Sequence, residues 1–211
     1  MNKLFFIVIL LFSNTAFAGL IGNIEHDYGS NYIPSLMGGS ACDVQQATHL
    51  TIKDSSGCQR FVEVFDFSHF SFDSIDYFQL DLTFSATSND NCWWFLCEFE
   101  SWHVRPALNS SYAPATGLPA LIRANGVTQQ SFVFNASNLS SIFDEIVNNN
   151  AFYLWFAENS YGSDQFNLYS ANLSIYGMPA QSAPDDVTPV PAPASIALLG
   201  LGLLMLRRFK K

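Results

Sequence analysis

The sequence has little positive charge and no apolar run as long as an ordinary membrane-spanning helix. It carries nine lysine and arginine residues against 18 acidic residues. Residues 19–190 contain four basic residues and all 18 acidic residues, which gives them a net charge of −14. A domain this acidic repels phosphate backbones, so nucleic acid is excluded as a partner. The two apolar runs, residues 4–12 and 194–206, contain nine and thirteen residues. A helix that spans a bilayer needs about 20.

The sequence also lacks the motifs that mark common catalytic and metal sites. It has no G-x-S-x-G nucleophile elbow, and its four histidines form no triad motif, so nucleophilic catalysis is unsupported. A zinc site that combines cysteines with His49 or His103 is disfavoured, because no C-x-x-C knuckle is present. We therefore predict neither a metal site nor a bound cofactor, with calcium as the one alternative.

That alternative rests on oxygen ligands rather than on a motif. The loop SNDN (88–91) is accompanied by Asp73, Asp76 and Asp164 elsewhere in the chain, and clustered carboxylates and amides are the ligands that Ca²⁺ prefers. No D-x-D-x-D-G run spaces them as a calcium loop does. Solvated loop acids in an acidic domain are the simpler interpretation.

Cysteine is scarce but even in number. Cys42, Cys58, Cys92 and Cys97 lie in a chain that we expect to leave the cytoplasm, and oxidising compartments favour disulfides. Four cysteines allow three connectivities. We favour Cys42–Cys58 and Cys92–Cys97, because each pair closes a short loop.

The N-terminus has the three parts of a secretory signal peptide. Lys3 supplies a positive charge, residues 4–12 an apolar run, and Ala16, Phe17 and Ala18 a small-x-small cleavage site. The run is too short for a plain transmembrane anchor. We predict export and cleavage before Gly19.

The C-terminus is apolar and ends in a basic cluster. Residues 194–206 carry no charge, and Arg207, Arg208, Lys210 and Lys211 follow them. Such a positive cluster stays on the cytoplasmic side, so the rest of the chain should lie outside, held by a C-terminal hydrophobic helix in the inner membrane. An ordinary single-span anchor is the alternative to a segment that is later removed.

This end of the chain resembles a known sorting signal. Pro191, Ala192, Pro193, Ala194 and Ser195 precede IALLGLGLLML and then RRFKK. The three-part order resembles the PEP-CTERM signal of Gram-negative bacteria, in which a Pro-Glu-Pro motif precedes an apolar helix and an arginine-rich end. Ala192 stands where the family has glutamate. The resemblance covers about 22 residues and implies recognition by an exosortase, in bacteria that make extracellular polysaccharide.

Between the two ends, the sequence predicts an all-β fold. Apolar and polar residues alternate, as in half-buried strands, over residues 48–54, 60–67, 76–87, 91–107, 130–136, 151–158 and 165–177. Residues 139–148 are typical of one short helix, which Ser140 or Ser141 could cap. We therefore predict an antiparallel β-sandwich of jelly-roll type. The layout is a signal peptide (1–18), the sandwich (19–177), a linker rich in proline, alanine and aspartate (178–190) and the sorting segment (191–211).

The segment WWFLCEFESWHV (93–104) holds the candidate site residues. On one continuous strand, Trp94, Glu98, Glu100 and Trp102 would share a face. Paired carboxylates are used in glycoside hydrolysis, and aromatic faces with a few polar groups hold sugars. The jelly-roll glucanases show three acids as E-x-D-x-x-E, whereas this segment offers only two. For each tryptophan, packing in the core is the favoured interpretation.

The sequence predicts where the protein goes more sharply than what it binds. We expect an exported, non-enzymatic β-sandwich protein, anchored in the membrane and then released to the cell envelope or extracellular matrix, where it associates with polysaccharide or biofilm. A surface polysaccharide hydrolase using Glu98 and Glu100 is the alternative from another class. A calcium-dependent adhesin is the third.

Overall fold

A computed structural model describes residues 18–29, 32, 34, 42–54, 61–88, 91–93, 96–98, 100–108, 118–158 and 164–180. The unit that contains them ends at Ala180. The predicted signal peptide, most of the linker and the sorting segment lie outside the described residues. Among the described residues, no helix is both long and apolar enough to cross a bilayer.

Six strands form the larger sheet, and every neighbouring pair in it is antiparallel. The order is β2-β3-β11-β5-β9, and β1 pairs with the part of β11 that β3 leaves free. The strands are β1 (Gly19–Asp27), β2 (Val44–Gln45), β3 (Leu50–Asp54), β5 (Phe72–Ser85), β9 (Thr128–Asn135) and β11 (Asp164–Pro179). The long strands β5 and β11 therefore form the centre of the sheet.

The smaller sheet has the order β4-β10-β8 and is also antiparallel. Its strands are β4 (Val62–Asp66), β8 (Trp102–Ala107) and β10 (Ala151–Glu158). Residues 119–121 continue it at the outer edge of β8, because the Val104 N–H donates to the Pro119 carbonyl and the Leu121 N–H donates to the Trp102 carbonyl. A separate hairpin consists of β6 (Asn91–Trp93) and β7 (Leu96–Glu98).

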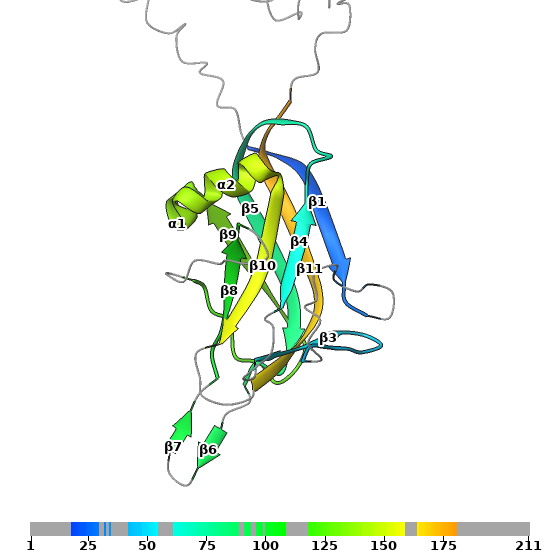
Figure 1. Ribbon diagram of the computed structural model, residues 1–211, viewed down its shortest axis with the longest axis vertical. Helices are drawn as coiled ribbons and strands as arrows, with labels where there is room; N and C mark the ends of the chain where they lie inside the picture. Colours follow the sequence, from blue (N-terminus) through cyan, green and yellow to red (C-terminus); the bar gives the residue numbers. More distant parts are fainter. Residues whose placement is uncertain are drawn as a thin grey trace, which may run out of the picture. The chain divides into compact units, whose positions relative to one another are not determined.

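The two sheets pack face to face through aromatic side chains. Strands β4, β10 and β8 lie over β5, β9 and β11 in Figure 1. Phe152 of β10 meets Phe78 of β5 at 5.6 Å and Phe134 of β9 at 5.7 Å between ring centroids, and Trp102 of β8 meets Phe166 of β11 at 4.7 Å. Each buried aromatic ring removes a large apolar area from water, which is the dominant favourable term for this fold.

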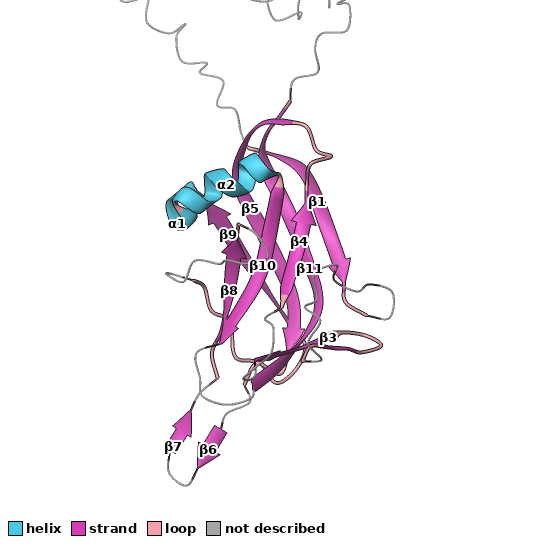
Figure 2. Ribbon diagram, in the orientation of Figure 1, coloured by secondary structure: helices cyan, strands magenta, loops and turns pink. Residues whose placement is uncertain are grey.

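Two short helices connect β9 to β10 (Figure 2). Asn135 caps α1 (Ala136–Leu139) in a reciprocal capping box with Asn138. Helix α2 (Ser141–Asn149) buries Phe143 and Ile146, on the apolar face that the sequence predicts. It ends at Asn150, whose left-handed backbone suits a C-cap.

The prediction of an all-β antiparallel fold is confirmed, with differences in detail. The predicted strand 151–158 coincides with β10, and the predicted strand 165–177 is β11 with slightly wider bounds. Strands β1 and β2 were not predicted. The segment 91–107 is three strands rather than one bent strand, and the predicted single helix is two helices. Ser140 precedes α2, but its side chain makes no capping hydrogen bond.

Candidate functional site

The outer side of the larger sheet carries a continuous set of polar side chains. In β5 the inward residues Phe78, Leu80 and Leu82 are no more than 1% exposed, and the residues between them point to the other side. Their partners in β11 alternate likewise except at Ser174, the partner of Gln79, which is buried at 8% exposure. We call this surface the outer polar face. It consists of Tyr77, Gln79, Asp81 and Thr83 of β5 and Asn167, Ser170, Asn172 and Tyr176 of β11.

Hydrogen bonds between neighbouring strands hold these polar side chains in place. The Thr51 hydroxyl on β3 donates to Asn167 Oδ1 at 3.2 Å, and Asn167 Nδ2 donates to Ser85 Oγ at 3.4 Å. Ser170 Oγ donates to Thr83 Oγ1 at 3.0 Å. A side chain fixed in this way loses little conformational entropy when it binds a ligand.

One end of the outer polar face is aromatic. Tyr77 and Tyr176 are directly paired in register, and their rings stack at 4.6 Å with an interplanar angle of 11°. Asp81 is the one charged member of the set, and both of its carboxylate oxygens accept from Gln79 Nε2 at 3.1 Å. Across β11 from β5, β1 adds the exposed Glu25 and Asp27, opposite Asn172 and Ser170. The face is therefore rich in neutral hydroxyl and amide groups, with negative charge beside them.

The predicted sugar-binding residues do not form a surface of this kind. Trp102 and Glu100 are each 2% exposed, and the Trp102 Nε1–H donates to the Glu100 carboxylate. Trp102 packs on Phe166 in the core. The interpretation of these two residues as an open sugar-binding or catalytic surface is therefore wrong. Trp94 and the side chain of Glu98 lie outside the described residues.

The physical reason is a break in the predicted strand. Strand β7 ends at Glu98 and β8 begins at Trp102. The two-residue alternation carries a face assignment only along uninterrupted extended backbone. Glu98 and Trp102 therefore belong to different sheets, and their spacing in the sequence does not place them on one face.

Cysteine pairing is described in part. Cys42 is disulfide-bonded, and none of the described cysteines is free; Cys58 lies outside the described residues. Cys92 and Cys97 face each other directly in the β6–β7 hairpin, and Cα atoms at such positions lie about 4.5–5.5 Å apart, within the range that a disulfide bridges. Both proposed pairs stay predictions.

A second polar cluster lies between the sheets, where β1 approaches β4. Glu63 of β4 is fully buried and accepts a hydrogen bond from the Tyr32 hydroxyl at 3.1 Å. His26 Nδ1 lies 3.4 Å from the same carboxylate. The His26 ring stacks on Tyr32 and on Phe65, each at 4.5 Å. Sequence reasoning missed this cluster, because it joins two segments, with Tyr32 and Glu63 31 positions apart, and matches no motif.

Burial strongly affects the tyrosines of this cluster. Burial, followed by the charge of Glu63, raises the pKa of Tyr28 well above its usual value. The same two causes raise the pKa of Tyr32. The cluster thus holds its tyrosines neutral, and its contacts join β1 to β4.

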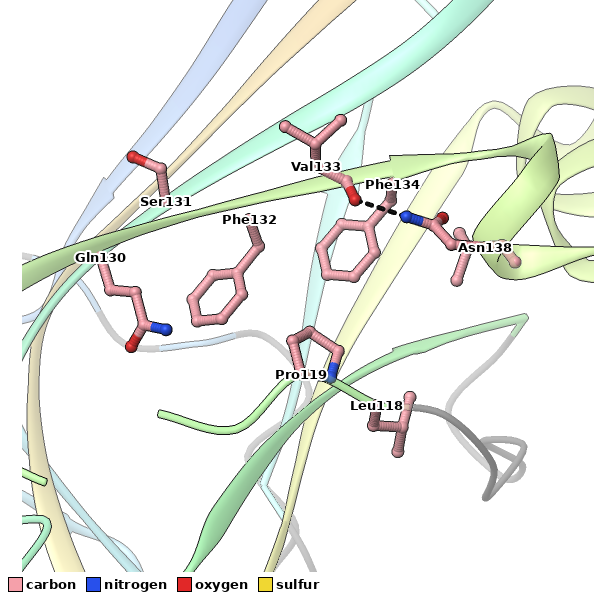
Figure 3. A pocket seen from close by; sticks show the side chains of 9 residues that line it. Leu118, Pro119, Gln130, Ser131, Phe132, Val133, Phe134 and Asn138 are labelled. Carbon is pink, nitrogen blue, oxygen red and sulfur yellow. Dashed lines mark hydrogen bonds between the residues drawn. The ribbon is translucent and has the colours of Figure 1, made fainter. Parts of the chain in front are cut away.

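A groove of about 400 Å³ runs along β9, the last strand of the larger sheet. Phe132 and Phe134 point from β9 toward Leu118 and Pro119 in Figure 3. The lining amides of Gln130 and Asn138 are used within the protein. Gln130 Nε2 donates to the Ala120 carbonyl at 3.0 Å and Asn138 Nδ2 donates to the Val133 carbonyl at 2.7 Å. The groove therefore combines apolar side chains with polar groups, and the two lining amides are already engaged within the protein.

The histidines named as metal candidates have other neighbours. His103 Nε2 lies 3.2 Å from Ser101 Oγ and its Nδ1 lies 3.3 Å from the Leu118 carbonyl, while His49 Nδ1 lies 3.1 Å from Thr48 Oγ1. In the part of the chain that the structure describes, no three histidine, cysteine or acidic side chains gather as a metal site would require. The sorting residues Pro191, Ala192, Pro193, Arg207 and Arg208 lie outside that part.

Comparisons with known proteins add little. No protein-family model matches the chain, and no curated protein matches it. Among solved structures, it is similar to the coat protein of Tobacco streak virus, at 13% identity and a TM-score of 0.31, over 73% of this chain and 97% of that chain. A likeness at this level carries no functional information, so the function has to come from this chain's own residues.

Proposed function

We propose that this protein is an exported, non-enzymatic β-sandwich of the cell envelope or extracellular matrix that binds a neutral polysaccharide through the outer polar face. The single observation that carries the binding proposal is the network of hydroxyl and amide side chains on β5 and β11, with the stacked pair Tyr77–Tyr176 at its end. The resemblance of the C-terminal segment to a PEP-CTERM signal carries the proposal about sorting by an exosortase.

The position of the first strand supports export with cleavage. Strand β1 begins at Gly19, the residue that follows the predicted cleavage site. Removal of residues 1–18 would therefore delete no described strand or helix. At the other end, β11 runs to Pro179, so cleavage near Pro193 would also leave the sandwich complete.

The chemistry of the outer polar face suits a neutral polymer. Sugar hydroxyls donate and accept hydrogen bonds, which amide and hydroxyl side chains can match, and apolar sugar faces stack on aromatic rings. An acidic polysaccharide would meet Asp81, Glu25 and Asp27 without a compensating cluster of basic residues on β5 or β11. We therefore expect selectivity for neutral chains over acidic ones.

We further assign the sandwich to the jelly-roll class. The larger sheet contains the order β3-β11-β5-β9, and the smaller sheet has β4-β10-β8 followed by residues 119–121. Consecutive strands β3, β4 and β5 alternate between the two sheets, as do β9, β10 and β11. That alternation is expected of an eight-stranded double-sheet jelly roll.

The alternative hydrolase has less support. It needs Glu98 and Glu100 together on an accessible surface, at the separation that glycoside hydrolysis uses. Glu100 is 2% exposed and is engaged by the Trp102 indole. A calcium-dependent adhesin has no specific observation in its favour. We retain the non-enzymatic binding module.

The binding proposal is tested by removing two amides of the outer polar face. In the exported protein, Gln79→Ala combined with Asn172→Ala should weaken binding to dextran or soluble starch at least about tenfold, because the hydrogen bonds to sugar hydroxyls are lost. Affinity electrophoresis in gels that contain each polymer measures the change. Alginate, an acidic polymer, should retard neither protein.

A matched control comes from the helix. Asn148 is exposed on α2, away from β5 and β11, so Asn148→Ala should bind as the wild type does. Equal retardation of the double variant and the wild type would place binding elsewhere. No retardation of the wild type by either neutral polymer would refute the proposed ligand class.

A further inference from the structure

The outer polar face adjoins a hollow of about 390 Å³ at the end of strand β1. Ser170, a member of the outer polar face, lines this hollow. Its other lining residues come from the end of β1, from the turn between β2 and β3, and from β11: Asp27, Tyr28, Gly29, Ala47, Thr48 and Tyr169. Pockets that hold small molecules have volumes of about 300–1,000 Å³. The hollow therefore has room for a group such as one sugar unit.

The hollow lies where the partner of β11 changes along one edge. Residues 164–168 of β11 pair with β3 and residues 170–177 pair with β1, which leaves Tyr169 between the two strands. On the other edge, the pairing of β11 with β5 shifts register between Leu168 and Ser170. Such a bulge re-aims a side chain, and bulges are frequent beside functional sites. The hollow thus lies at an irregular junction rather than on a regular part of the sheet.

The bulge places two consecutive side chains of β11 on the outer side of the sheet. The Tyr169 hydroxyl lies 3.2 Å from Ser85 Oγ, which also accepts from Asn167 of the outer polar face. Ser170 Oγ donates to Thr83 Oγ1, another member of that face. Tyr169 therefore joins the outer polar face to the hollow.

An aromatic pair stands beside the hollow. The rings of Tyr169 and His49 lie 5.2 Å apart between centroids, tilted by 42°. At the other end of the outer polar face, Tyr77 and Tyr176 stack. Residues 169 and 176 are roughly 20 Å apart along β11, because a strand rises about 3.3 Å per residue. The outer polar face is thus flanked by aromatic rings at both ends, which suits an extended chain of sugar units.

The turn between β2 and β3 borders the hollow. Gly29 lies against this turn, where a Cβ at position 29 would come within 2.9 Å of the Ala47 carbonyl. The Gln46 N–H donates to the His49 carbonyl at 2.9 Å and so fixes the turn. A polymer that follows β11 along the outer polar face would meet the turn here, so its last unit fits the hollow better than a middle unit does.

Asp27 supplies the charged group of the hollow. It is exposed at the end of β1 and lies opposite Ser170 in register. Within the part of the chain that the structure describes, its carboxylate takes part in no hydrogen bond or ion pair. A carboxylate accepts several hydrogen bonds, and those from hydroxyl groups are shorter and stronger than bonds between neutral partners. Asp27 is therefore placed to accept from sugar hydroxyls.

We propose that the hollow binds the terminal unit of the neutral polysaccharide, so that this protein recognises chain ends. The inference rests on the function proposed above for the outer polar face, which holds the units that follow. A terminal unit carries a free hydroxyl where an internal unit is bonded to its neighbour. Asp27 accepts hydrogen bonds from the hydroxyls of the terminal unit, and the Tyr169 ring packs on its apolar face.

Linear and cyclic oligosaccharides of equal length separate end recognition from binding along a chain, because a cyclic molecule has no ends. The probes are maltoheptaose against cyclomaltoheptaose, and isomaltoheptaose against its cyclic form. Calorimetric titration of the detergent-solubilised full chain measures each affinity. The wild type should bind the linear member of at least one pair about tenfold more tightly than the cyclic member, which is the contribution of one charge-assisted hydrogen bond.

Variants of the hollow test its role in this preference. Asp27→Ala should lower the affinity for the linear sugar about tenfold and leave that for the cyclic sugar unchanged. Thr48→Trp should have the same effect, because the indole fills the hollow from its exposed turn. Glu25→Ala is the matched control. Glu25 is exposed on β1 opposite Asn172 and does not line the hollow, so this variant should keep the preference of the wild type.

The outcomes distinguish this inference from the function on which it rests. Equal affinity of the wild type for linear and cyclic sugars, or a preference that survives in Asp27→Ala or Thr48→Trp, would overturn end recognition and leave binding along the outer polar face intact. Loss of the preference in Glu25→Ala would also overturn it, because negative charge on β1 would then be the cause. Failure of the wild type to bind the oligosaccharides, dextran or starch would refute both proposals.

Discussion

At the residue scale, Asp43 shows how a partly buried acid couples this fold to pH. It follows the disulfide-bonded Cys42 and accepts a hydrogen bond from the Lys53 N–H at 2.9 Å. Burial nevertheless raises the pKa of Asp43 to about 6, against a usual value of 3.8. The folded protein therefore binds this proton more tightly than the unfolded chain does.

A stability measurement should detect that difference. Because the pKa is raised in the folded state, the contribution of Asp43 is complete below about pH 4 and is lost as the pH rises to about 6. Asp43→Asn should remove this decrease and make the protein roughly 1–2 kcal/mol more stable than the wild type at pH 7, once solvent screening is allowed for. Urea unfolding at pH 4, 5, 6 and 7 gives the comparison.

Asp66 provides a control of opposite sign. Hydrogen bonds from Ser68 lower the pKa of Asp66, so its contribution is present above the usual pKa and lost as the pH falls. Asp66→Asn should leave the decrease between pH 4 and 6 in place. If Asp43→Asn keeps the pH profile of the wild type, the carboxyl at position 43 is not the group responsible.

Residue roles were the hardest feature to predict from the sequence. The preference of tryptophan for burial holds for Trp102, which is 2% exposed. The assignment of Glu100 to an open face fails because the strand breaks between Glu98 and Trp102, and alternation alone cannot locate such a break. The cluster around Glu63 was also missed, because only the packing of β1 on β4 brings His26 to that carboxylate.

At the element scale, alternation predicted the central strands of both sheets and also the edge strands β4 and β9. Strands β5, β10 and β11 each alternate buried and more exposed positions over most of their length, as a strand with one buried face must. Strand β1 escaped prediction because it carries two glycines and a bulge between Leu20 and Gly22, which disturb the period of two. The two-residue strand β2 is too short to give a pattern.

The aromatic contacts between the sheets make a prediction about stability. Phe152 of β10 is fully buried and touches the rings of Phe65, Phe78 and Phe134. Phe152→Ala should reduce the free energy of unfolding by about 3–5 kcal/mol, through lost burial and a cavity. Urea unfolding measures it, with Val127→Ala as the control because Val127 is 62% exposed. A change in Phe152→Ala no larger than in the control would mean that this contact does not hold the sheets together.

At the scale of the whole molecule, the two ends of the chain predict targeting, whereas the middle forms the folded sheets. The ends were interpreted from short patterns of charge and hydrophobicity, which predict a membrane route without reference to a folded structure. The middle folds into two sheets whose order could not be deduced, because pairing such as β11 with β5 joins residues about 90 positions apart. The outer polar face likewise appears only once these strands lie side by side.

The central claim is that both ends are removable and that the sandwich is the mature protein. The most direct test is the intact mass of the protein recovered from its native host. We expect a mass that begins at Gly19 and ends near Pro193, with or without an added group, which would also mean that Ala192 is accepted where the sorting family has glutamate. A mass that still includes RRFKK would contradict the account and identify the C-terminal segment as a permanent single-span anchor.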